Sequence, residues 1–152
     1  PRNIEYFKRH ISLNGINNVF LLESAVGNLN GSANFQEGSS TFEGRLDGDG
    51  KLTVRINRLD DLVKEGKIPP PSFLKIDVEG KLKDVIDGAV GIIGERKPKI
   101  LFEADYKEDR QVFDFLKEHD YEVVPLDTND FFTSSNFFAL NKNENSSHSS
   151  KL

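Results

Sequence analysis

The sequence contains no cysteine. This absence excludes disulfides, thiolate metal ligands and a cysteine nucleophile, and it fits the reducing cytoplasm. The sequence also lacks any run of about 18 or more apolar residues, so no segment is long enough to cross a membrane as a helix. Composition therefore predicts a cytoplasmic protein with no membrane partner.

Positive charge is scarce as well. The chain has 20 Lys and Arg against 25 Asp and Glu, with a net charge of -5. No stripe of basic residues is present, which argues against a nucleic-acid partner, because phosphates are bound by clustered Lys and Arg. The stretch 45–56 resembles a calcium loop in its aspartates, but Arg45 and Ile56 occupy positions that should be acidic. No metal site is therefore predicted.

What is present indicates one globular domain. The 152 residues are 36% hydrophobic and 30% charged. A chain of this length buries about two-thirds of its unfolded surface, so it can form a substantial core. Apolar residues at helical or alternating spacing predict helices at 3–14, 58–67, 81–96 and 108–119, and strands at 18–24, 51–57, 73–78, 99–103, 121–126 and 136–141.

The order of these elements predicts the fold class. A weak hairpin is expected within 27–50, and the polar segment 142–152 lacks the apolar residues that a packed structure needs, so it is expected to be disordered. Strands that alternate with helices at this spacing are typical of βαβ units. The sequence therefore predicts an α/β fold with a largely parallel sheet.

Two of the predicted strands end in carboxylates. The strand 73–78 leads into Asp77, Glu79 and Gly80, and the strand 99–103 leads into Glu103 and Asp105. Ligands of open parallel sheets bind beyond the carboxyl ends of the strands, so this edge is the candidate site. Gly80 permits a tight turn or the close approach of a ligand. The alternative is that such carboxylates only cap the following helices.

Two further features have two interpretations each. Side chains alternate along a strand, so Lys75 shares a face with Phe73 and Asp77. Lys75 either forms a structural ion pair with an acid such as Asp77 or points toward the site. The phenylalanines at 131, 132, 137 and 138 either pack in the core, which is the favoured interpretation, or line an acceptor pocket.

Three segments carry a family resemblance: "FLKIDVEG" at 73–80, "DGA" at 87–89 and "KPKILFEAD" at 97–105. In this order they resemble the FkbM-type methyltransferase family. The segments "LLESAVGN" at 21–28 and "INRLDDLV" at 56–63 are also similar to parts of that family. The resemblance implies a class I, Rossmann-like enzyme that uses S-adenosylmethionine, mostly for O-methylation. The expected acceptor is a small-molecule or saccharide hydroxyl.

The resemblance also implies roles for individual residues. Asp77 and Glu79 would lie beside the methyl group of the cofactor, and Glu103 would match the family's acid after the fifth strand. Lys75 is the fourth catalytic candidate, on the ground of its position in the strand and not of the resemblance. The cofactor's adenine would lie near the turn formed by Ser24, Ala25 and Val26. Methyl transfer needs alignment of the two reactants and a base for the hydroxyl proton, which a carboxylate can supply.

The resemblance implies a fold that is incomplete in this chain. Residues 1–141 match the C-terminal portion of the methyltransferase domain, without its first two strands and glycine-rich turn, and the last strand is expected to be antiparallel. The chain alone is therefore expected to bind S-adenosylmethionine poorly and to be inactive. Two alternatives remain: a degenerate binding domain, because Lys81 and Leu82 follow the motif, or a Rossmann-like nucleotide-sugar enzyme.

Overall fold

The computed structural model describes residues 2–37, 44–46, 52–78 and 80–145. The chain divides into two compact units. The N-terminal unit comprises Pro1–Ala25 and Gly31–Ile56, and the C-terminal unit comprises Val26–Asn30 and Asn57–Leu152. None of the helices in the described ranges is long and apolar enough to span a bilayer.

The N-terminal unit contains a helix and most of a four-stranded sheet. Helix α1 (Arg2–Leu13) confirms the helix predicted at 3–14, although none of its residues is fully buried. The sheet has the order β1-β4-β2-β3, and β2 is antiparallel to both neighbours. Its strands are β1 (Ala25–Val26), β2 (Gly31–Glu37), β3 (Gly44–Leu46) and β4 (Leu52–Asn57). The predicted hairpin and the strand at 51–57 are thereby confirmed.

The strand predicted at 18–24 is wrong. These residues form no regular element, and strand β1 begins only at Ala25. A strand needs a neighbour to receive its backbone hydrogen bonds. In the described residues no strand pairs with this segment, and two of its four apolar side chains stay exposed, Val19 to 45% and Phe20 to 73%. Apolar composition alone therefore gave a false strand here.

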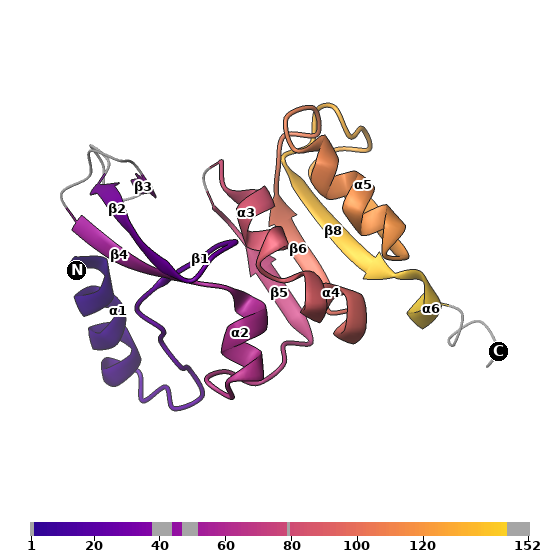
Figure 1. The fold of residues 1–152 in the computed structure, drawn as a ribbon. Coiled ribbons are helices and arrows are strands. Elements are labelled where there is room, and N and C mark those ends of the chain that lie inside the picture. The colour runs from indigo at the N-terminus through magenta and orange to yellow at the C-terminus, as the bar shows by residue number, and fades with distance from the viewer. Residues whose placement is uncertain (1, 38–43, 47–51, 79, 146–152) are drawn as a thin grey trace. The chain divides into compact units, whose positions relative to one another are not determined.

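The C-terminal unit is built on a second four-stranded sheet (Figure 1). Its order is β5-β6-β8-β7, so β8 lies between the two strands that precede it in the chain. The strands are β5 (Phe73–Ile76), β6 (Lys99–Glu103), β7 (Tyr121–Pro125) and β8 (Asn136–Asn141). Strands β5 and β6 run parallel, whereas β8 is antiparallel to both β6 and β7.

The α/β class is confirmed, but the prediction of a largely parallel sheet is wrong. In the described sheets the β5–β6 pair is parallel, and the β2–β3, β2–β4, β6–β8 and β7–β8 pairs are antiparallel. The cause lies in the connections. A helix-containing crossover joins β5 to β6, whereas β7 and β8 are joined by a loop alone, which favours an antiparallel pair. The predicted antiparallel last strand is confirmed.

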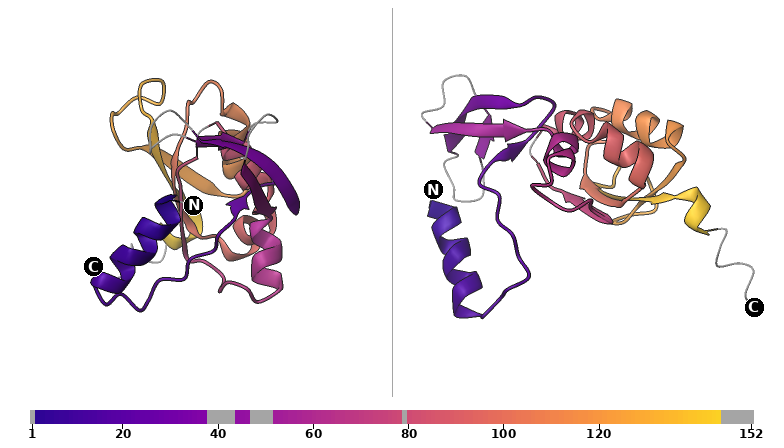
Figure 2. Two further views of the ribbon diagram at one scale, coloured as in Figure 1. Left: turned by 90° about the vertical axis from the view of Figure 1, so that its left-hand side faces the viewer. Right: turned by 60° about the horizontal axis from the view of Figure 1, so that its bottom comes forward.

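Helices α3, α4 and α5 lie on the same face of this sheet (Figures 1 and 2). The helices of the unit are α2 (Leu59–Lys64), α3 (Leu82–Asp87), α4 (Val90–Arg96), α5 (Arg110–Glu118) and α6 (Lys142–Asn145). The helix predicted at 81–96 is thus two helices, separated at Gly88 and Ala89. Helix α6 forms the start of the segment predicted to be a disordered tail, and 146–152 lie outside the described residues.

The hydrophobic core lies between this sheet face and the helices. Strand side chains two residues apart point to the same face, as in Ile100 and Phe102, which are 0% and 1% exposed. Helices α3, α4 and α5 cover them with Val85, Ile93 and Leu116. Each fully buried side chain of this size contributes about 1.5–3 kcal/mol relative to exposure. This packing fixes the edge of the sheet where β5 and β6 end.

Two contacts hold the turn between α3 and α4. The N–H of Asp60 donates to the carbonyl of Gly88 over 2.9 Å. The backbone of Gly27 also lies so close that a Cβ atom at Gly88 would be 2.0 Å from the Gly27 carbonyl oxygen. Gly88 has an ordinary helical backbone (φ -80°), so close approach, and not a special dihedral angle, requires glycine here.

Asp60 also caps helix α4 from a distant part of the chain. Its Oδ2 accepts the N–H of Gly91 over 3.0 Å, and its Oδ1 accepts the N–H of Ile92 over 2.9 Å. The residue that precedes the helix, Ala89, has no side-chain acceptor and cannot cap it. The carboxylate of Asp60 therefore satisfies backbone donors that the helix itself leaves unpaired.

We expect Asp60→Ala to lower the free energy of unfolding by about 1–2 kcal/mol, as loss of a helix cap does. Asp60→Asn retains one acceptor oxygen and should lose less. Urea denaturation followed by circular dichroism measures both variants against the wild type. Equal stability of Asp60→Ala and wild type would contradict the capping role.

Candidate active site

Strands β5 and β6 bring two of the predicted carboxylates together. Asp77 follows the last residue of β5, Glu103 is the last residue of β6, and the neighbouring residues Ile76 and Phe102 are paired in the sheet. The carboxyl group of Glu103 lies near enough to Asp77 to contribute to its lowered pKa. The prediction that both strands deliver carboxylates to one edge is therefore confirmed. Gly80 has a φ of 63°, which confirms the predicted turn.

Lys75 forms the ion pair that was one of its two predicted interpretations. Its Nζ lies 2.5 Å from Oδ2 of Asp77, and both side chains are 59% exposed. The hydrogen bond and the charge of Lys75 are the main causes that hold the pKa of Asp77 below its ordinary value of 3.8. Slight burial opposes this effect, and the neighbouring Glu103 adds a smaller contribution to it. Asp77 therefore carries a full negative charge at neutral pH.

We expect Lys75→Met to raise the pKa of Asp77 toward 3.8. Because the pair lowers the folded-state pKa, its stabilisation is present above 3.8 and is lost as pH falls through that lower value. The shift is modest, since water screens exposed pairs. Carbon-13 NMR titration of the Asp77 carboxyl group measures it. Lys83→Met, which removes the partner of Asp87, is the matched control and should leave Asp77 unchanged.

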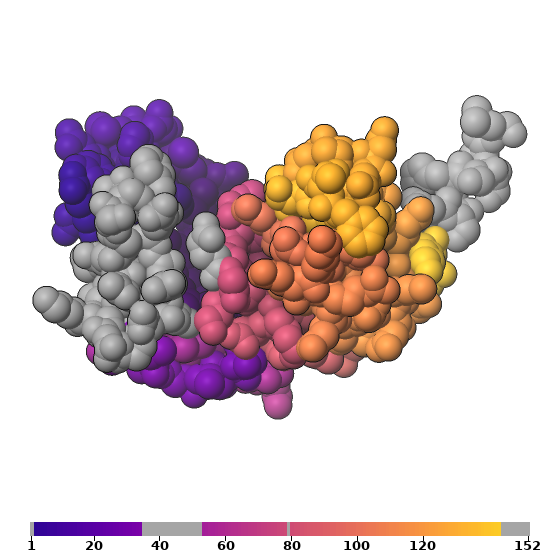
Figure 3. Space-filling view, turned by 90° about the horizontal axis from the view of Figure 1, so that it is seen from above, coloured from indigo at the N-terminus to yellow at the C-terminus, as the bar shows by residue number. Residues whose placement is uncertain are grey.

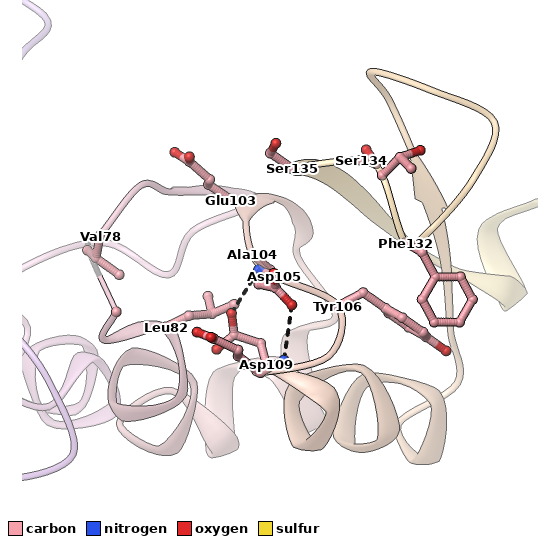
Figure 4. Close-up of a pocket in the computed structure, with 13 residues that line it drawn as sticks. Val78, Leu82, Glu103, Ala104, Asp105, Tyr106, Asp109, Phe132, Ser134 and Ser135 are labelled. Atoms are coloured by element: carbon pink, nitrogen blue, oxygen red, sulfur yellow. Dashed lines mark hydrogen bonds between the residues drawn. The ribbon is translucent and has the colours of Figure 1, made fainter.

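A pocket of about 370 Å³ opens beside this edge (Figure 4). This volume is within the range of small-molecule sites. Seen from above, the segment after β6 and the segment before β8 lie side by side (Figure 3), and the N–H of Ala104 donates to the carbonyl of Ser135 over 3.0 Å. The pocket is lined by Val78, Gly80, Leu82, Glu103, Ala104, Asp105, Tyr106, Glu108, Asp109, Phe132, Thr133, Ser134 and Ser135.

Two aspartates fix the pocket wall that follows β6. Oδ1 of Asp105 accepts the backbone N–H groups of Lys107 and Glu108 over 2.8 and 3.1 Å, and Oδ2 of Asp109 accepts that of Asp105 over 3.1 Å (Figure 4). The two backbone bonds lower the pKa of Asp105. Burial is the main cause that raises the pKa of Asp109, and the charge of Asp105 acts in the same direction. The wall is therefore rigid and negatively charged.

Two aromatic rings form another part of the pocket wall. The rings of Tyr106 and Phe132 meet edge to face, with centroids 5.2 Å apart and planes at 89° (Figure 4). Tyr106 is held by Arg110, whose Nη1 donates to the tyrosine hydroxyl over 2.7 Å and whose guanidinium lies 5.1 Å from the ring centre. Of the four predicted phenylalanines, Phe137 is fully buried in the core and Phe132 lines the pocket.

The loop that carries Phe132 is closed by backbone bonds to two aspartates. Oδ1 of Asp130 accepts the N–H of Phe132 over 3.0 Å. Oδ2 of Asp127 accepts the N–H groups of Ser135 and Asn136 over 3.0 and 2.8 Å. The side-chain amide of Asn136 is the main cause that lowers the pKa of Asp127, and the backbone bonds add to this effect. The loop backbone is therefore fixed on both sides of Phe132.

The other predicted site residues are Glu79, Ser24, Ala25 and Val26. Glu79 lies outside the described residues. Val26 is partly buried and packs against the core of the C-terminal unit, whereas Ser24 and Ala25 belong to the N-terminal unit. Among the described residues, no three His, Cys, Asp or Glu side chains are grouped so that they could hold a metal ion.

Sequence reasoning missed several pocket residues. Asp109 was placed inside a predicted helix at 108–119, but α5 begins at Arg110 and Asp109 precedes it. Aspartates directly before an amphipathic helix are a signal of a turn in which side-chain oxygens bind backbone N–H groups. No sequence pattern indicated that Tyr106 and Glu108 line a pocket, because their positions depend on the path of the chain after β6. Leu82, which follows the recognised motif, is a core residue that also contributes to the pocket.

Comparison with known proteins identifies the family. Residues 7–123 match the family model described as the methyltransferase FkbM domain. The crystal structure of methyltransferase FkbM from Methylobacillus flagellatus KT is similar, with a TM-score of 0.59 and 17% sequence identity over 91% of this chain. At this identity the likeness supports the fold, and the chain spans 33% of that protein. No curated protein matches the chain. The chain belongs to the FkbM methyltransferase domain family.

Proposed function

We propose that this chain takes part in the transfer of a methyl group from S-adenosylmethionine to a hydroxyl of a small molecule or saccharide. The observation that carries the proposal is the pair of carboxyl groups of Asp77 and Glu103 at the common edge of β5 and β6, beside a pocket of about 370 Å³. The family membership supports methyl transfer, and the geometry supports this edge as its location.

The residues present fit this cofactor. Bound S-adenosylmethionine would supply an electrophilic methyl group on a positively charged sulfonium. Asp77 is negatively charged at neutral pH, and its partner Glu103 is exposed at the pocket, so both suit a cationic ligand.

The proposed roles follow from position and charge. Asp77, kept ionised by Lys75, stabilises the positive charge that develops on the attacking hydroxyl oxygen. Glu103, which lines the pocket, accepts the hydroxyl proton as the new bond forms. Ser24, Ala25 and Val26 are proposed to contact the adenine, and Glu79 is proposed to act beside Asp77. Lys75 positions Asp77 through the ion pair.

Calorimetric titration of the full-length protein with S-adenosylhomocysteine tests this proposal. We expect saturable binding to one site. Absence of binding would refute cofactor use, and binding without methyl transfer to any hydroxyl acceptor would favour a degenerate binding domain.

A further inference from the structure

Phe132 is a large apolar side chain that the protein keeps exposed at its pocket. Its side chain is 65% exposed and lines the pocket, although the phenylalanine five residues later is fully buried. Asp127 and Asp130 accept backbone N–H groups of the loop, and these bonds fix the backbone that carries the ring. A rigidly presented aromatic ring at a pocket is suited to contact a ligand at low entropic cost.

Tyr106 makes this ring part of a two-ring surface. Its ring lies edge to face against Phe132, and its hydroxyl accepts a hydrogen bond from Arg110. We call Tyr106 and Phe132 the aromatic platform. An apolar face of a ligand can lie against such a platform, because burying apolar area there is favourable.

The charge of the pocket restricts the ligand further. Its described lining includes four carboxylate side chains and neither lysine nor arginine: Glu103, Asp105, Glu108 and Asp109. Carboxylates accept hydrogen bonds and cannot donate them when ionised, so they select hydroxyl donors. They also repel phosphates and other anions.

We propose that the aromatic platform binds the acceptor and that the acceptor is a saccharide ring without a phosphate group. A saccharide has an apolar C–H face for the platform and several hydroxyl donors for the carboxylates. A flat aromatic acceptor has few such hydroxyl donors. A sugar phosphate or a nucleotide sugar carries negatively charged phosphate, which the carboxylates of the pocket repel. This inference rests on the proposed function, because it names the acceptor class of the same site.

Saturation-transfer NMR and affinity titration on the full-length protein test the inference without any methyl donor. The probes are the methyl α-glycosides of glucose, mannose and galactose, with glucose 6-phosphate as the charged comparison. We expect at least one neutral glycoside to bind, and glucose 6-phosphate to bind at least about tenfold more weakly, with a smaller difference at high salt.

The variants test the platform itself. Phe132→Leu should weaken glycoside binding by about fivefold or more, whereas Phe132→Tyr should retain it. Phe73→Leu, at another exposed phenylalanine of the same unit, is the control and should bind as the wild type does. Binding of S-adenosylhomocysteine should be unchanged in all three variants.

The outcomes separate this inference from the proposed function. Three results would each overturn the inference. The first is the absence of a saturation-transfer signal for all three glycosides, and the second is an affinity for glucose 6-phosphate equal to that for the glycosides. The third is a Phe132→Leu variant that binds glycoside as tightly as the wild type does. Failure of S-adenosylhomocysteine to bind the wild type would instead refute the proposed use of the cofactor, while glycoside binding to the platform could still be measured.

Discussion

Replacement of Gly88 by alanine is expected to lower the free energy of unfolding by about 3 kcal/mol, at the upper end of the usual cost of overpacking. The new Cβ would meet the carbonyl oxygen of Gly27 at 2.0 Å and its carbonyl carbon at 2.9 Å. Both atoms belong to the backbone, so the clash cannot be relieved by rotation of a side chain. Urea denaturation followed by circular dichroism measures the loss.

Gly94→Ala is the matched control. This glycine lies inside α4, and the nearest atom to a Cβ there is His119 Cδ2 at 3.7 Å, which is an ordinary contact. Alanine is favoured over glycine in a helix by about 1 kcal/mol, so this variant should be slightly more stable than the wild type. If Gly88→Ala and Gly94→Ala had the same stability, the close approach of Gly27 would not be a constraint.

Asp77→Asn is expected to lower kcat by about 100-fold while the affinity for S-adenosylhomocysteine changes little. Positive charge moves toward the acceptor oxygen during methyl transfer, so the carboxylate acts mainly in the transition state, and loss of one such partner costs about this factor. Steady-state kinetics on the full-length protein with an accepted hydroxyl substrate, together with calorimetry, separate the two effects.

Asp87→Asn is the control for the loss of one negative charge. Asp87 ends helix α3 and pairs with Lys83 at the surface, so its replacement should leave kcat unchanged. An unchanged kcat in Asp77→Asn would contradict the proposed role of Asp77. Glu103→Gln ranks next, because Glu103 lines the pocket and ends the strand that pairs with β5.

The part of the site that the sequence could predict is the part that strands position directly. Asp77 and Glu103 come at the ends of apolar segments, and parallel strands bring such ends to one edge, so their proximity followed from local pattern alone. The alternation of side chains along a strand predicted that Lys75 and Asp77 lie on the same face. These arguments need no knowledge of distant parts of the chain.

The rest of the site depends on which strands pair with one another, and no local sequence pattern shows this. The pocket wall with Phe132 exists because β8 lies beside β6, which brings Ser135 against Ala104. Apolar segments were also ambiguous: residues 18–24 and β5 have similar composition, but β5 has a paired neighbour and the other segment has none in the described residues. Whether an apolar segment becomes a strand is decided by its partner.

The position of β8 between β6 and β7 has a consequence for how the chain folds. Strand β7 is made before β8, yet in the described residues it has β8 as its partner in the sheet and cannot pair until β8 is in place. Synthesis proceeds from the N-terminus, so β7 waits until residues 136–141 have left the ribosome. The sheet is therefore completed late, and the loop that presents Phe132 closes in the same step.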